Sequence, residues 1–504
     1  MEHLTPTRRC ALGAGLGVLL LAASGCGNTL LDHDADPSLL ELNCAPGLTA
    51  CAGLCQSCSA PANAVPACVA GACGFECNSG YNRCSADACI AESATSCGAA
   101  CADCSAAVLP PDASAICSSA HVCDFVCNPG FLRSGSSCAR AIAVSAGFVH
   151  TCALTADGSV KCWGANDAGQ LGNGTATDSL APVDVTLPGK ATILAAGYEH
   201  TCAVVGGVVY CWGDNTFGEI GDGTTTTRLS PVPVTGLPPT VALGAGGGIL
   251  NQTISFGHTC AVDGQGAVKC WGANSAGQLG DGTTAVRTSP VPVTILPGGT
   301  SVSQVACGER HTCVVAAGGA VYCFGANDTG QLGIGTMSAQ VAPATTTLAS
   351  GASAVFTGQA HSCALAGGLL CWGNNNSGQV DPGATTTGSF LSPTSPGLGP
   401  FAPTAVATGR AHTCAVDASA SPAVPRCFGQ NDAGQLGGGA SPPAGPVAVT
   451  LLPPATAQAM TAGENHTCLL TGEGGIQCWG ANGRGQLGIA SPSTTSPPAY
   501  VSGR

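Results

Sequence analysis

Seven copies of one motif constrain the fold of this chain more than any other feature. Each copy runs close to G-x-x-H-T-C, then a short turn, then C-W-G-x-N-x-x-G-Q-L-G, and all seven lie between residues 145 and 490. The histidines of the copies follow one another at intervals of 50 to 58 residues: His150, His200, His258, His311, His361, His412 and His466. Such a period predicts a closed repeat architecture. A residue present in every copy is expected to build the repeat.

Each repeat predicts four short β-strands. The first is an apolar run such as residues 142–144, and the second carries H-T-C. A turn such as residues 155–158, whose Asp-Gly pair is a strong hairpin signal, leads to a third strand that carries V-x-C-W-G. A fourth strand contains prolines, as in residues 231–234, which suits an outer edge strand. Four strands in each of seven units predict an all-β, seven-bladed β-propeller over residues 139–504.

These residues resemble the regulator of chromosome condensation repeat family. The resemblance covers residues 141–504 and rests on H-T-C-A-L followed by C-W-G-x-N-x-x-G-Q-L-G in seven copies. It implies a propeller in which segments 142–144 and 498–501 complete one blade together. It also implies, as one alternative, guanine-nucleotide exchange on a small GTPase, which is the activity of the family's eukaryotic namesake. The fold itself carries unrelated activities, so the resemblance says more about architecture than about function.

The low charge of the chain argues against one class of partner. Only 9% of the residues are charged, the net charge is −13, and the 15 Lys and Arg never cluster beyond a pair. Nucleic acid is therefore not expected as a partner. The 74 Gly and 33 Pro fall mostly at fixed places in the repeat, which identifies them as turn residues.

The first 25 residues predict an export signal. Arg8 and Arg9 precede a short apolar run, and segment 21–26 ends in small residues followed by Cys26. This segment resembles a bacterial lipoprotein signal, which implies cleavage before Cys26 and acylation of that cysteine. An ordinary secretory signal and a twin-arginine signal are the alternatives. Several acyl chains would anchor the exported protein to the cell envelope, and Gly27 in second position favours the outer membrane.

Two further segments precede the repeats. Residues 26–43 are acidic without a turn or strand pattern, and they predict a tether. Residues 44–138 hold 16 cysteines in two similar halves. In an exported protein this density predicts a small disulfide-rich module, with zinc binding by the C-x-x-C pairs as the alternative. Eight cysteines in each half allow roughly a hundred pairings, and spacing alone selects none of them.

Every repeat carries one pair of cysteines. Cys152 and Cys162 are centred on a hairpin turn, so the two should face each other with Cα atoms about 4.5 Å apart, within disulfide range. The same argument predicts one disulfide in each blade: Cys152 with Cys162, Cys202 with Cys211, Cys260 with Cys270, Cys313 with Cys323, Cys363 with Cys371, Cys414 with Cys427, and Cys468 with Cys478. Each should contribute roughly 2–3 kcal/mol. Cys307 is the odd cysteine of the repeats and is predicted to be a free thiol.

Other residues that recur in the motif are assigned structural roles. One position holds an aromatic side chain in every repeat: Trp163, Trp212, Trp271, Phe324, Trp372, Phe428 and Trp479. It predicts packing between neighbouring sheets, with a stacking platform for sugars or bases as the alternative. The seven histidines are expected to be hydrogen-bonded structural residues, with a metal site on the axis as the alternative. No cofactor is expected.

Binding is expected where the repeats differ, because propellers usually bind through variable loops. An insertion before the third histidine contains Gly246, Ile249 and Asn251. The fifth repeat replaces part of G-Q-L-G with a segment that contains Asp381, and the sixth hairpin is stretched around Pro422. These five residues mark the candidate binding loops. Insertions tolerated without function are the alternative.

Together these features favour a membrane-anchored, non-enzymatic binding or scaffold protein that engages a protein or glycan through its propeller loops. The oligomeric state is left open. An extracytoplasmic propeller hydrolase or lyase is the alternative from the enzyme class. Such a site needs clustered carboxylates with Arg or Tyr. The chain has five Tyr and few charges in the blades, so this cluster is not expected.

Overall fold

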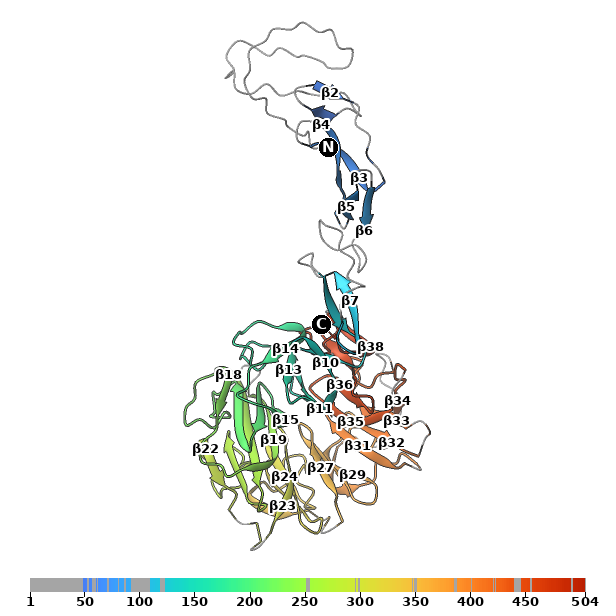
Figure 1. The fold of residues 1–504 in the computed structure, drawn as a ribbon. Helices are drawn as coiled ribbons and strands as arrows, with labels where there is room; N and C mark the ends of the chain where they lie inside the picture. Colours follow the sequence, from blue (N-terminus) through green and yellow to red (C-terminus); the bar gives the residue numbers. More distant parts are fainter. Residues whose placement is uncertain are drawn as a thin grey trace, which may run out of the picture. The chain divides into compact units, whose positions relative to one another are not determined.

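The computed structural model describes residues 49–91 and 109–503, apart from gaps of one to seven residues (Figure 1). The signal segment 1–25, Cys26, the tether 26–43, Asn251 and Pro422 lie outside the described residues. Contacts divide the chain into two compact units, Met1–Leu109 with Ala113–Val126 and Pro110–Asp112 with Cys127–Arg504. Among the described residues, no helix is long and apolar enough to cross a membrane.

The first unit consists, where it is described, of antiparallel strand pairs. The pairs are β1 (Thr49–Cys51) with β2 (Leu54–Gln56), β3 (Ala64–Val69) with β4 (Ala72–Cys77), β5 (Tyr81–Ser85) with β6 (Ala88–Ala91), and β7 (Ala113–Cys117) with β8 (Cys123–Cys127). Two-stranded hairpins bury little apolar surface and are marginal alone. Cross-links between cysteines are the expected source of stability for such a module.

The second unit is a β-propeller of seven four-stranded antiparallel sheets, each built from consecutive strands. Blades 1 to 3 comprise β11 (Ala141–Ala146), β12 (His150–Thr155), β13 (Val160–Gly164) and β14 (Ser179–Val185); β15 (Ala191–Ala196), β16 (His200–Val205), β17 (Val208–Gly213) and β18 (Arg228–Pro233); and β19 (Thr240–Leu250), β20 (Ile254–Asp263), β21 (Val268–Gly272) and β22 (Arg287–Pro292). The all-β propeller predicted from the seven motif copies is thus confirmed.

The other four blades follow the same order. Blades 4 and 5 comprise β23 (Val302–Cys307), β24 (His311–Ala316), β25 (Val321–Gly325) and β26 (Gln340–Thr345); and β27 (Ala354–Thr357), β28 (His361–Leu365), β29 (Leu369–Asn374) and β30 (Ser389–Thr394). Blades 6 and 7 comprise β31 (Pro403–Thr408), β32 (His412–Asp417), β33 (Val424–Gly429) and β34 (Val447–Ala448); and β35 (Ala457–Ala462), β36 (His466–Thr471), β37 (Ile476–Asn482) and β38 (Ser493–Tyr500). The proline-containing strands β18 and β22 are outermost, where the missing N–H groups cost no ladder bond.

The ring closes differently from the arrangement that the resemblance implied. Segments 142–144 and 498–501 were expected to share one blade, and this prediction is wrong. β11 pairs with β12 in blade 1, whereas β38 is the outer strand of blade 7. Each blade is complete with its own four consecutive strands, so no strand position is left open for the other end of the chain. The ring closes instead because β11 packs beside β35 and β36.

A short segment before the repeats braces this closure. Residues 127–140, which we call the clasp, include the strand pair β9 (Leu132–Ser134) and β10 (Ser137–Ala139) and a disulfide between Cys127 and Cys138. Cys127 N–H donates to the carbonyl of Gly503 at 3.2 Å, and the Ser134 hydroxyl donates to Asp157 at 2.7 Å. Asp157 stands in the turn between β12 and β13. The clasp therefore joins both ends of the repeat region at the end of the blades where the second strand turns into the third. We call this the turn-bearing end of the blades.

The blade cysteines stand opposite each other in register, as the hairpin symmetry predicts. Cys152 faces Cys162 across β12 and β13, and the same holds in every blade. The Cα atoms of the seven pairs are 4.0–4.2 Å apart, and each pair is joined by a disulfide. Cys307 carries no disulfide and is buried.

The recurring aromatic side chain of each blade packs against the disulfide of the preceding blade. Trp212 shares a core cluster with Cys152 and Cys162, and all seven aromatics are fully buried. The corresponding clusters of the other blades place Trp271 with Cys202 and Cys211, Phe324 with Cys260 and Cys270, Trp372 with Cys313 and Cys323, Phe428 with Cys363 and Cys371, Trp479 with Cys414 and Cys427, and Trp163 with Cys468 and Cys478. Packing between sheets is thus the role of this position.

Candidate functional site at the mouth of the central channel

The seven motif histidines form a closed ring of hydrogen bonds between blades. In each case Nε2 lies 2.8–3.0 Å from the hydroxyl of the Thr or Ser that follows the next blade's histidine. The pairs are His150 with Thr201, His200 with Thr259, His258 with Thr312, His311 with Ser362, His361 with Thr413, His412 with Thr467, and His466 with Thr151. We call these fourteen residues the His ring. The ring links blade 7 back to blade 1 without a shared strand.

The direction of these bonds follows from a second contact of each hydroxyl. Thr201 donates its hydroxyl proton to the backbone carbonyl of Gln170 at 2.9 Å, and every blade repeats this bond at 2.7–2.9 Å. Because a hydroxyl has one proton, the Thr oxygen must accept from His Nε2–H. Each imidazole therefore carries a proton on Nε2, and its burial favours the neutral form. Burial lowers the pKa of His150 to about 3 and that of His200 to about 4.

The His ring is closed to solvent, and its Nε2 atoms are used for bonds between blades, whereas Nδ1 of His150, His258, His311, His361, His412 and His466 has no hydrogen-bond partner. All seven side chains are at most 1% exposed, and each Nε2 is occupied as a donor. Among the described residues, no group of three or more His, Cys, Asp or Glu is placed to hold a metal ion. The interpretation of the histidines as hydrogen-bonded structural residues agrees with this geometry.

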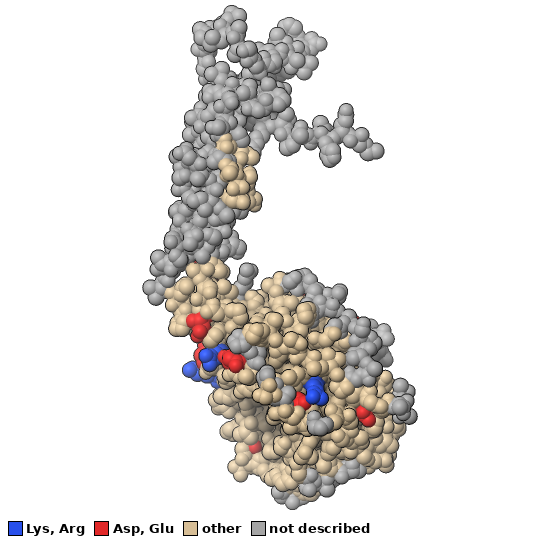
Figure 2. Space-filling view, turned by 90° about the vertical axis from the view of Figure 1, so that its right-hand side faces the viewer, with Lys and Arg blue, Asp and Glu red and all other residues tan. Residues whose placement is uncertain are grey.

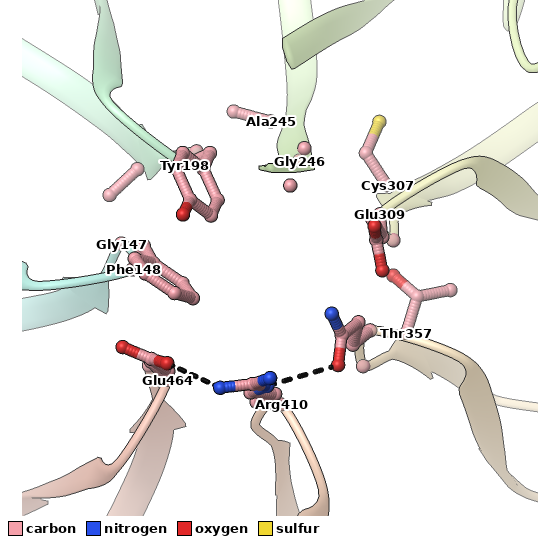
Figure 3. A pocket seen from close by; sticks show the side chains of 18 of the residues that line it. Gly147, Phe148, Tyr198, Ala245, Gly246, Cys307, Glu309, Thr357, Arg410 and Glu464 are labelled. Carbon is pink, nitrogen blue, oxygen red and sulfur yellow. Dashed lines mark hydrogen bonds and ion pairs between the residues drawn. The ribbon is translucent and has the colours of Figure 1, made fainter. Parts of the chain in front are cut away.

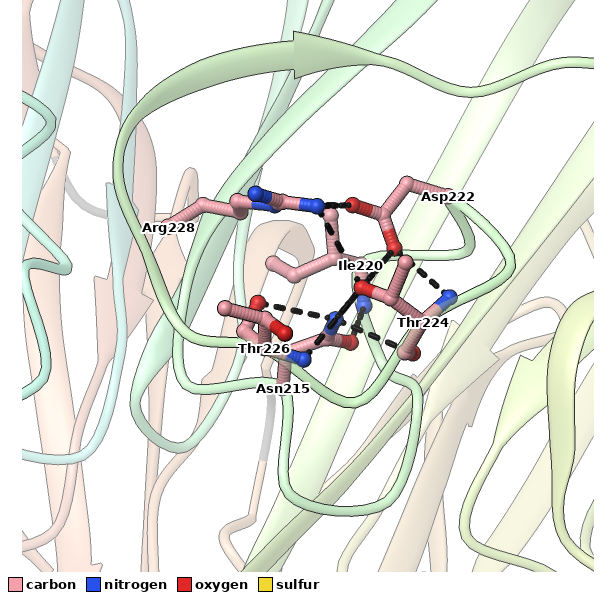
Figure 4. Close-up of polar contacts among 6 residues, drawn as sticks. All are labelled: Asn215, Ile220, Asp222, Thr224, Thr226 and Arg228. Carbon is pink, nitrogen blue, oxygen red and sulfur yellow. Dashed lines mark hydrogen bonds and ion pairs between the residues drawn. The ribbon is translucent and has the colours of Figure 1, made fainter.

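A buried asparagine organises the loop between the third and fourth strands (Figure 4). It is the Asn of C-W-G-x-N, which recurs among the repeats. In blade 2, Asn215 Nδ2 donates to the carbonyl of Thr224 at 3.1 Å, and its Oδ1 accepts from Ile220 N–H at 3.0 Å. Asp222 binds Arg228 at 2.6 Å on the same loop. The corresponding bonds are made by Asn166, Asn274 and Asn327. These loops are internally satisfied rather than open for a ligand.

The residues two positions before the histidines behave differently, because their side chains surround an opening (Figure 3). Six blades contribute Phe148, Tyr198, Glu309, Gln359, Arg410 and Glu464. Blade 3 contributes Gly246, Gly247 and Gly248 from the extended hairpin of β19 and β20. We call these nine residues the mouth. They border a cavity of about 110 Å³, which adjoins a second hollow of about 250 Å³ lined by the first strands of all seven blades.

The mouth has an aromatic side and a polar side. The rings of Phe148 and Tyr198 stack with centroids 4.0 Å apart. Arg410 donates to Glu464 at 2.6 Å and to the side chain of Gln359 at 3.3 Å. The side chain of Gln359 is in turn hydrogen-bonded to Glu309. A polar chain therefore runs across blades 4 to 7, facing the aromatic pair of blades 1 and 2.

The mouth is held by backbone bonds between neighbouring blades. Glu464 N–H donates to the carbonyl of Phe148 at 2.9 Å, and Phe148 N–H donates to that of Tyr198 at 3.3 Å. The turns of blades 3 to 7 are linked in the same way, through the amides of Gly247, Glu309, Gln359 and Arg410. The side chains therefore project from a frame that is fixed on both flanks, which favours a preorganised site.

Burial perturbs the carboxyl groups of this region. It raises the pKa of Glu309 and of Glu464, although Arg410 stabilises the ionised form of both. It also raises the pKa of the Tyr198 phenol, to which the charges of Glu199 and Glu464 add. The two mouth carboxylates are thus only partly compensated by the single arginine among the lining residues.

The cysteine beside the mouth is protected rather than reactive. Cys307 lines the cavity from the end of β23 but is only 8% exposed. Burial raises the pKa of its thiol to about 12, so the thiolate is scarce at neutral pH.

One blade departs from the motif at a position next to the extended hairpin. Glu219 stands where the other blades have Gln, and its carboxyl accepts from Phe217 N–H at 2.7 Å and from Gly257 N–H at 3.0 Å. Gly257 pairs with Gly247 of the mouth. Burial, followed by the charge of Asp214, raises the pKa of Glu219 to about 8. The hydrogen bond from Gly257 ties Glu219 of blade 2 to the extended hairpin of blade 3.

The structure separates the five candidate binding residues. Gly246 lines the mouth, and Ile249, 40% exposed, lies further along the same hairpin. Asp381 is engaged in its own loop, where its N–H donates to Asn375 and its carboxylate accepts from Gly383. Asn251 and Pro422 lie outside the described residues.

Sequence reasoning missed the six side chains of the mouth. They occupy the second position of G-x-x-H, which the motif writes as variable, and variation at one position within otherwise uniform repeats was the available signal. The expectation that carboxylates could not cluster with Arg and Tyr is also wrong, because Glu309, Glu464, Arg410 and Tyr198 all border the mouth. Residues about 50 positions apart meet there because the ring brings every blade to one axis.

Comparison with known proteins identifies the family. The model for the RCC1-like domain matches residues 125–421, and the model for the regulator of chromosome condensation (RCC1) repeat matches residues 458–486. The first match alone covers more than half of the chain. The chain belongs to the RCC1-like domain family.

Curated relatives of this RCC1-like domain include proteins with different names and lengths. The chain is 33% identical over 195 residues to the ultraviolet-B receptor UVR8 of Arabidopsis thaliana, which covers 38% of this chain and 42% of the receptor. It is 31% identical over 266 residues to the mitochondrial RCC1 domain-containing protein RUG3 of the same plant, covering 49% and 56%. The chain thus spans about half or less of the length of these relatives.

Solved structures share the fold of the RCC1-like domain at low identity. Prp20p from Saccharomyces cerevisiae aligns with a TM-score of 0.59 at 19% identity, covering 69% of this chain and 87% of that one. Human WBSCR16 aligns with a TM-score of 0.58 at 23% identity, covering 68% and 93%. At these identities the likeness concerns the fold alone.

Proposed function

We propose that this protein is an exported, membrane-anchored binding protein without enzymatic activity, and that it engages a protein partner through the mouth. The observation that carries the proposal is the contrast within one motif. Every blade repeats the His ring, whereas the position two residues earlier varies among the blades, and in six of the seven blades it borders an opening framed by backbone bonds between blades. A variable side-chain set on an invariant frame is typical of recognition surfaces.

Three further features support the proposal. The clasp enters the propeller at the turn-bearing end of the blades, whereas the mouth lies at the opposite end of the same strands. Charged side chains are sparse on the described part of the face shown in Figure 2, whereas three of the nine mouth residues, Glu309, Arg410 and Glu464, are charged. Fold relatives bind proteins, since Prp20p is described with its binding to Gsp1p and histones, and Kap60 has been solved bound to it.

The binding site is tested by photo-crosslinking with the full-length mature protein. A benzophenone amino acid replaces Gln359 in the mouth, and a matched control carries it at exposed Lys190 near the turn-bearing end. We expect a discrete crosslinked protein from the cell envelope at position 359 and none at position 190. Equal crosslinking at both positions, or none at position 359, would contradict the proposal.

Membrane anchoring is tested separately by mass spectrometry of the purified protein. Cleavage before Cys26 with an acylated N-terminal cysteine is expected, together with fractionation in the outer membrane. A mature N-terminus at another residue, or a Cys26 without acyl chains, would remove the anchor while leaving the binding site untouched.

A hydrolase or lyase is the second candidate, because the mouth brings two carboxylates, an arginine and a tyrosine together. The engagement of Glu464 by Arg410 speaks for binding instead, since a general acid is usually kept free of such a partner. Turnover of an oligosaccharide that is lost in both Glu309→Gln and Glu464→Gln would replace the binding proposal with the enzymatic one.

A further inference from the structure

The chemistry of the mouth indicates which group of a partner it accepts. The aromatic pair Phe148 and Tyr198 borders one side, and their ring faces and edges are the only large apolar surfaces among the side chains that line the cavity. Aromatic faces attract cations through their quadrupole, most effectively where water is displaced. The aromatic side therefore favours either an apolar group or a cation over an anion.

The polar side of the mouth favours a cation over an apolar group as the occupant. Its charged members are Glu309, Glu464 and Arg410, which leave one net negative charge when both carboxylates are ionised. Arg410 forms its ion pair with Glu464 rather than with Glu309. Glu309 has the weaker hydrogen bond of Gln359 as its side-chain contact. An apolar occupant would bury this carboxylate without a charge partner, which is costly.

The surroundings add to the negative potential. Glu199 follows Tyr198 in the chain, and its pKa is raised first by burial and then by the neighbouring charge of Asp214. Arg310, beside Glu309 in the chain, acts in the opposite direction on Glu309 alone. An incoming anion would meet Glu309 and Glu464 together, whereas an incoming cation would relieve the same desolvated carboxylates.

We propose that the mouth receives an arginine side chain of the protein partner, with the guanidinium between the Phe148–Tyr198 pair and the carboxylate of Glu309. This inference rests on the proposed function and names the group that the same site recognises. A planar guanidinium satisfies both walls at once, because it stacks on aromatic rings and donates two parallel hydrogen bonds to a carboxylate. The compact ammonium of lysine meets the carboxylate but stacks less well. Gly247 and Gly248 complete the third side without side chains of their own, and Gly248 lies directly against the side chain of Glu309.

The test uses the full mature protein and three capped tripeptides, Ac-Gly-Arg-Gly-NH2 and its Lys and Glu counterparts, in calorimetric titrations at low salt. We expect the arginine peptide to bind most tightly and the glutamate peptide not to bind. Binding should weaken as salt is raised. Equal affinity for the lysine and arginine peptides, or preference for the glutamate peptide, would overturn the assignment.

Matched variants locate the binding. Glu309→Gln should weaken the arginine peptide at least about tenfold, and Phe148→Leu should weaken it about threefold or more. Glu473→Gln makes the same chemical change in the turn between β36 and β37, away from the mouth, and should alter affinity less than about twofold. An arginine peptide that binds equally to Glu309→Gln and to the unaltered protein would sink the inference.

The two levels of the proposal fail separately. A crosslink at position 359 that persists while the arginine peptide does not bind would leave the mouth as a protein-binding site and remove only its preference for arginine. Absence of a crosslink together with absence of peptide binding would remove both.

Discussion

The His ring and the mouth occupy positions two residues apart in the same motif and differ in every physical respect. The ring is buried, neutral and nearly identical in all blades, and each hydroxyl in it both donates and accepts. The mouth is partly open and carries aromatic, amide and charged side chains that vary among the blades. The difference teaches that the repeat fixes a frame by hydrogen bonds between blades and thereby frees the adjacent position to vary. Under the proposed function, stability and recognition fall to separate positions on the same turn.

Acid should break the ring, and this is the largest effect expected. Burial lowers the pKa of the seven ring histidines to about 3 or 4, against 6.5 in the unfolded chain. Their stabilising contribution is therefore fully present above pH 6.5 and is lost as pH falls below it. Each histidine contributes about 1.4 kcal/mol per pH unit, so the seven contribute about 10 kcal/mol per unit.

The measurement is the melting temperature by calorimetry between pH 8 and pH 4, with the near-ultraviolet signal of the buried tryptophans as a second probe. A steep fall below pH 6 is expected. An unchanged melting temperature down to pH 4 would show that the imidazoles are not held neutral as the ring requires.

Glu219 should show the opposite pH dependence. Burial raises the pKa of its carboxyl to about 8, against 4.5 in the unfolded chain. Its contribution to the free energy of unfolding is therefore complete below pH 4.5. This contribution, several kcal/mol at most, is lost as pH rises from 4.5 towards 8. Glu219→Gln cannot ionise but leaves one of two amide donors, on Phe217 or Gly257, without an acceptor. The variant should therefore be less stable than the unaltered protein at pH 5 and gain relative stability by pH 8.

The readout for Glu219 is the difference in melting temperature between the two proteins as a function of pH. A difference that stays constant from pH 5 to pH 8 would mean that the carboxyl ionises normally. Gln278→Glu makes the matched change at the equivalent position of blade 3. The neighbouring hairpin of blade 4 is not extended, so a carboxyl at this position lacks the additional backbone amide that Gly257 offers to Glu219. The variant therefore tests whether the hydrogen bond to the extended hairpin affects stability.

Thr413→Val removes one hydroxyl of the ring with almost no change of shape. His361 Nε2–H then loses its acceptor, and the carbonyl of Gln379 loses its hydroxyl donor. Phe428 occupies the aromatic position of that blade and has no N–H to offer. A loss of about 2–3 kcal/mol in the free energy of unfolding is expected, measured by denaturant titration.

Blade 2 provides the matched control for this substitution. Trp212 Nε1–H donates to the carbonyl of Gln170 at 2.9 Å, the carbonyl that also accepts from Thr201. Thr201→Val therefore leaves that carbonyl with a donor and should cost about 1 kcal/mol less than Thr413→Val. Equal losses in the two blades would show that the indole contributes nothing to the ring.

The parts of this molecule that follow from local sequence could be predicted, and the parts that depend on ring closure could not. The hairpin symmetry of Cys152 and Cys162 sufficed to place their Cα atoms within disulfide range. The partner of His150 is Thr201, 51 residues away in the next blade, and no spacing rule within one repeat reveals it. The shared closing blade was carried over from the family, and a fourth strand within the last repeat made it unnecessary.

The mouth escaped prediction for a related reason. Phe148, Glu309 and Arg410 belong to separate repeats, and each alone is a variable residue in a turn. Only the closed ring converts this variation into one cavity with two chemically different sides. The cavity could be found from sequence only by comparing the repeats with one another at each motif position.

Arg410→Ala should have the smallest effect on stability and therefore sharpens the comparison most directly. Arg410 lies three residues before Thr413 in the same blade, but its side chain is 43% exposed, and that of its partner Glu464 is 17% exposed. An ion pair with one exposed member contributes modestly, so a loss of about 1 kcal/mol or less is expected by the same denaturant titration. A loss as large as that of Thr413→Val would mean that the mouth also carries the fold, and the division between frame and recognition surface would fail. Removal of the Arg410 guanidinium also frees Glu464 to bind the ligand. We therefore expect Arg410→Ala to bind the arginine peptide at least as tightly as the unaltered protein does. This result, together with so small a loss of stability, would show that the frame tolerates substitutions in the mouth.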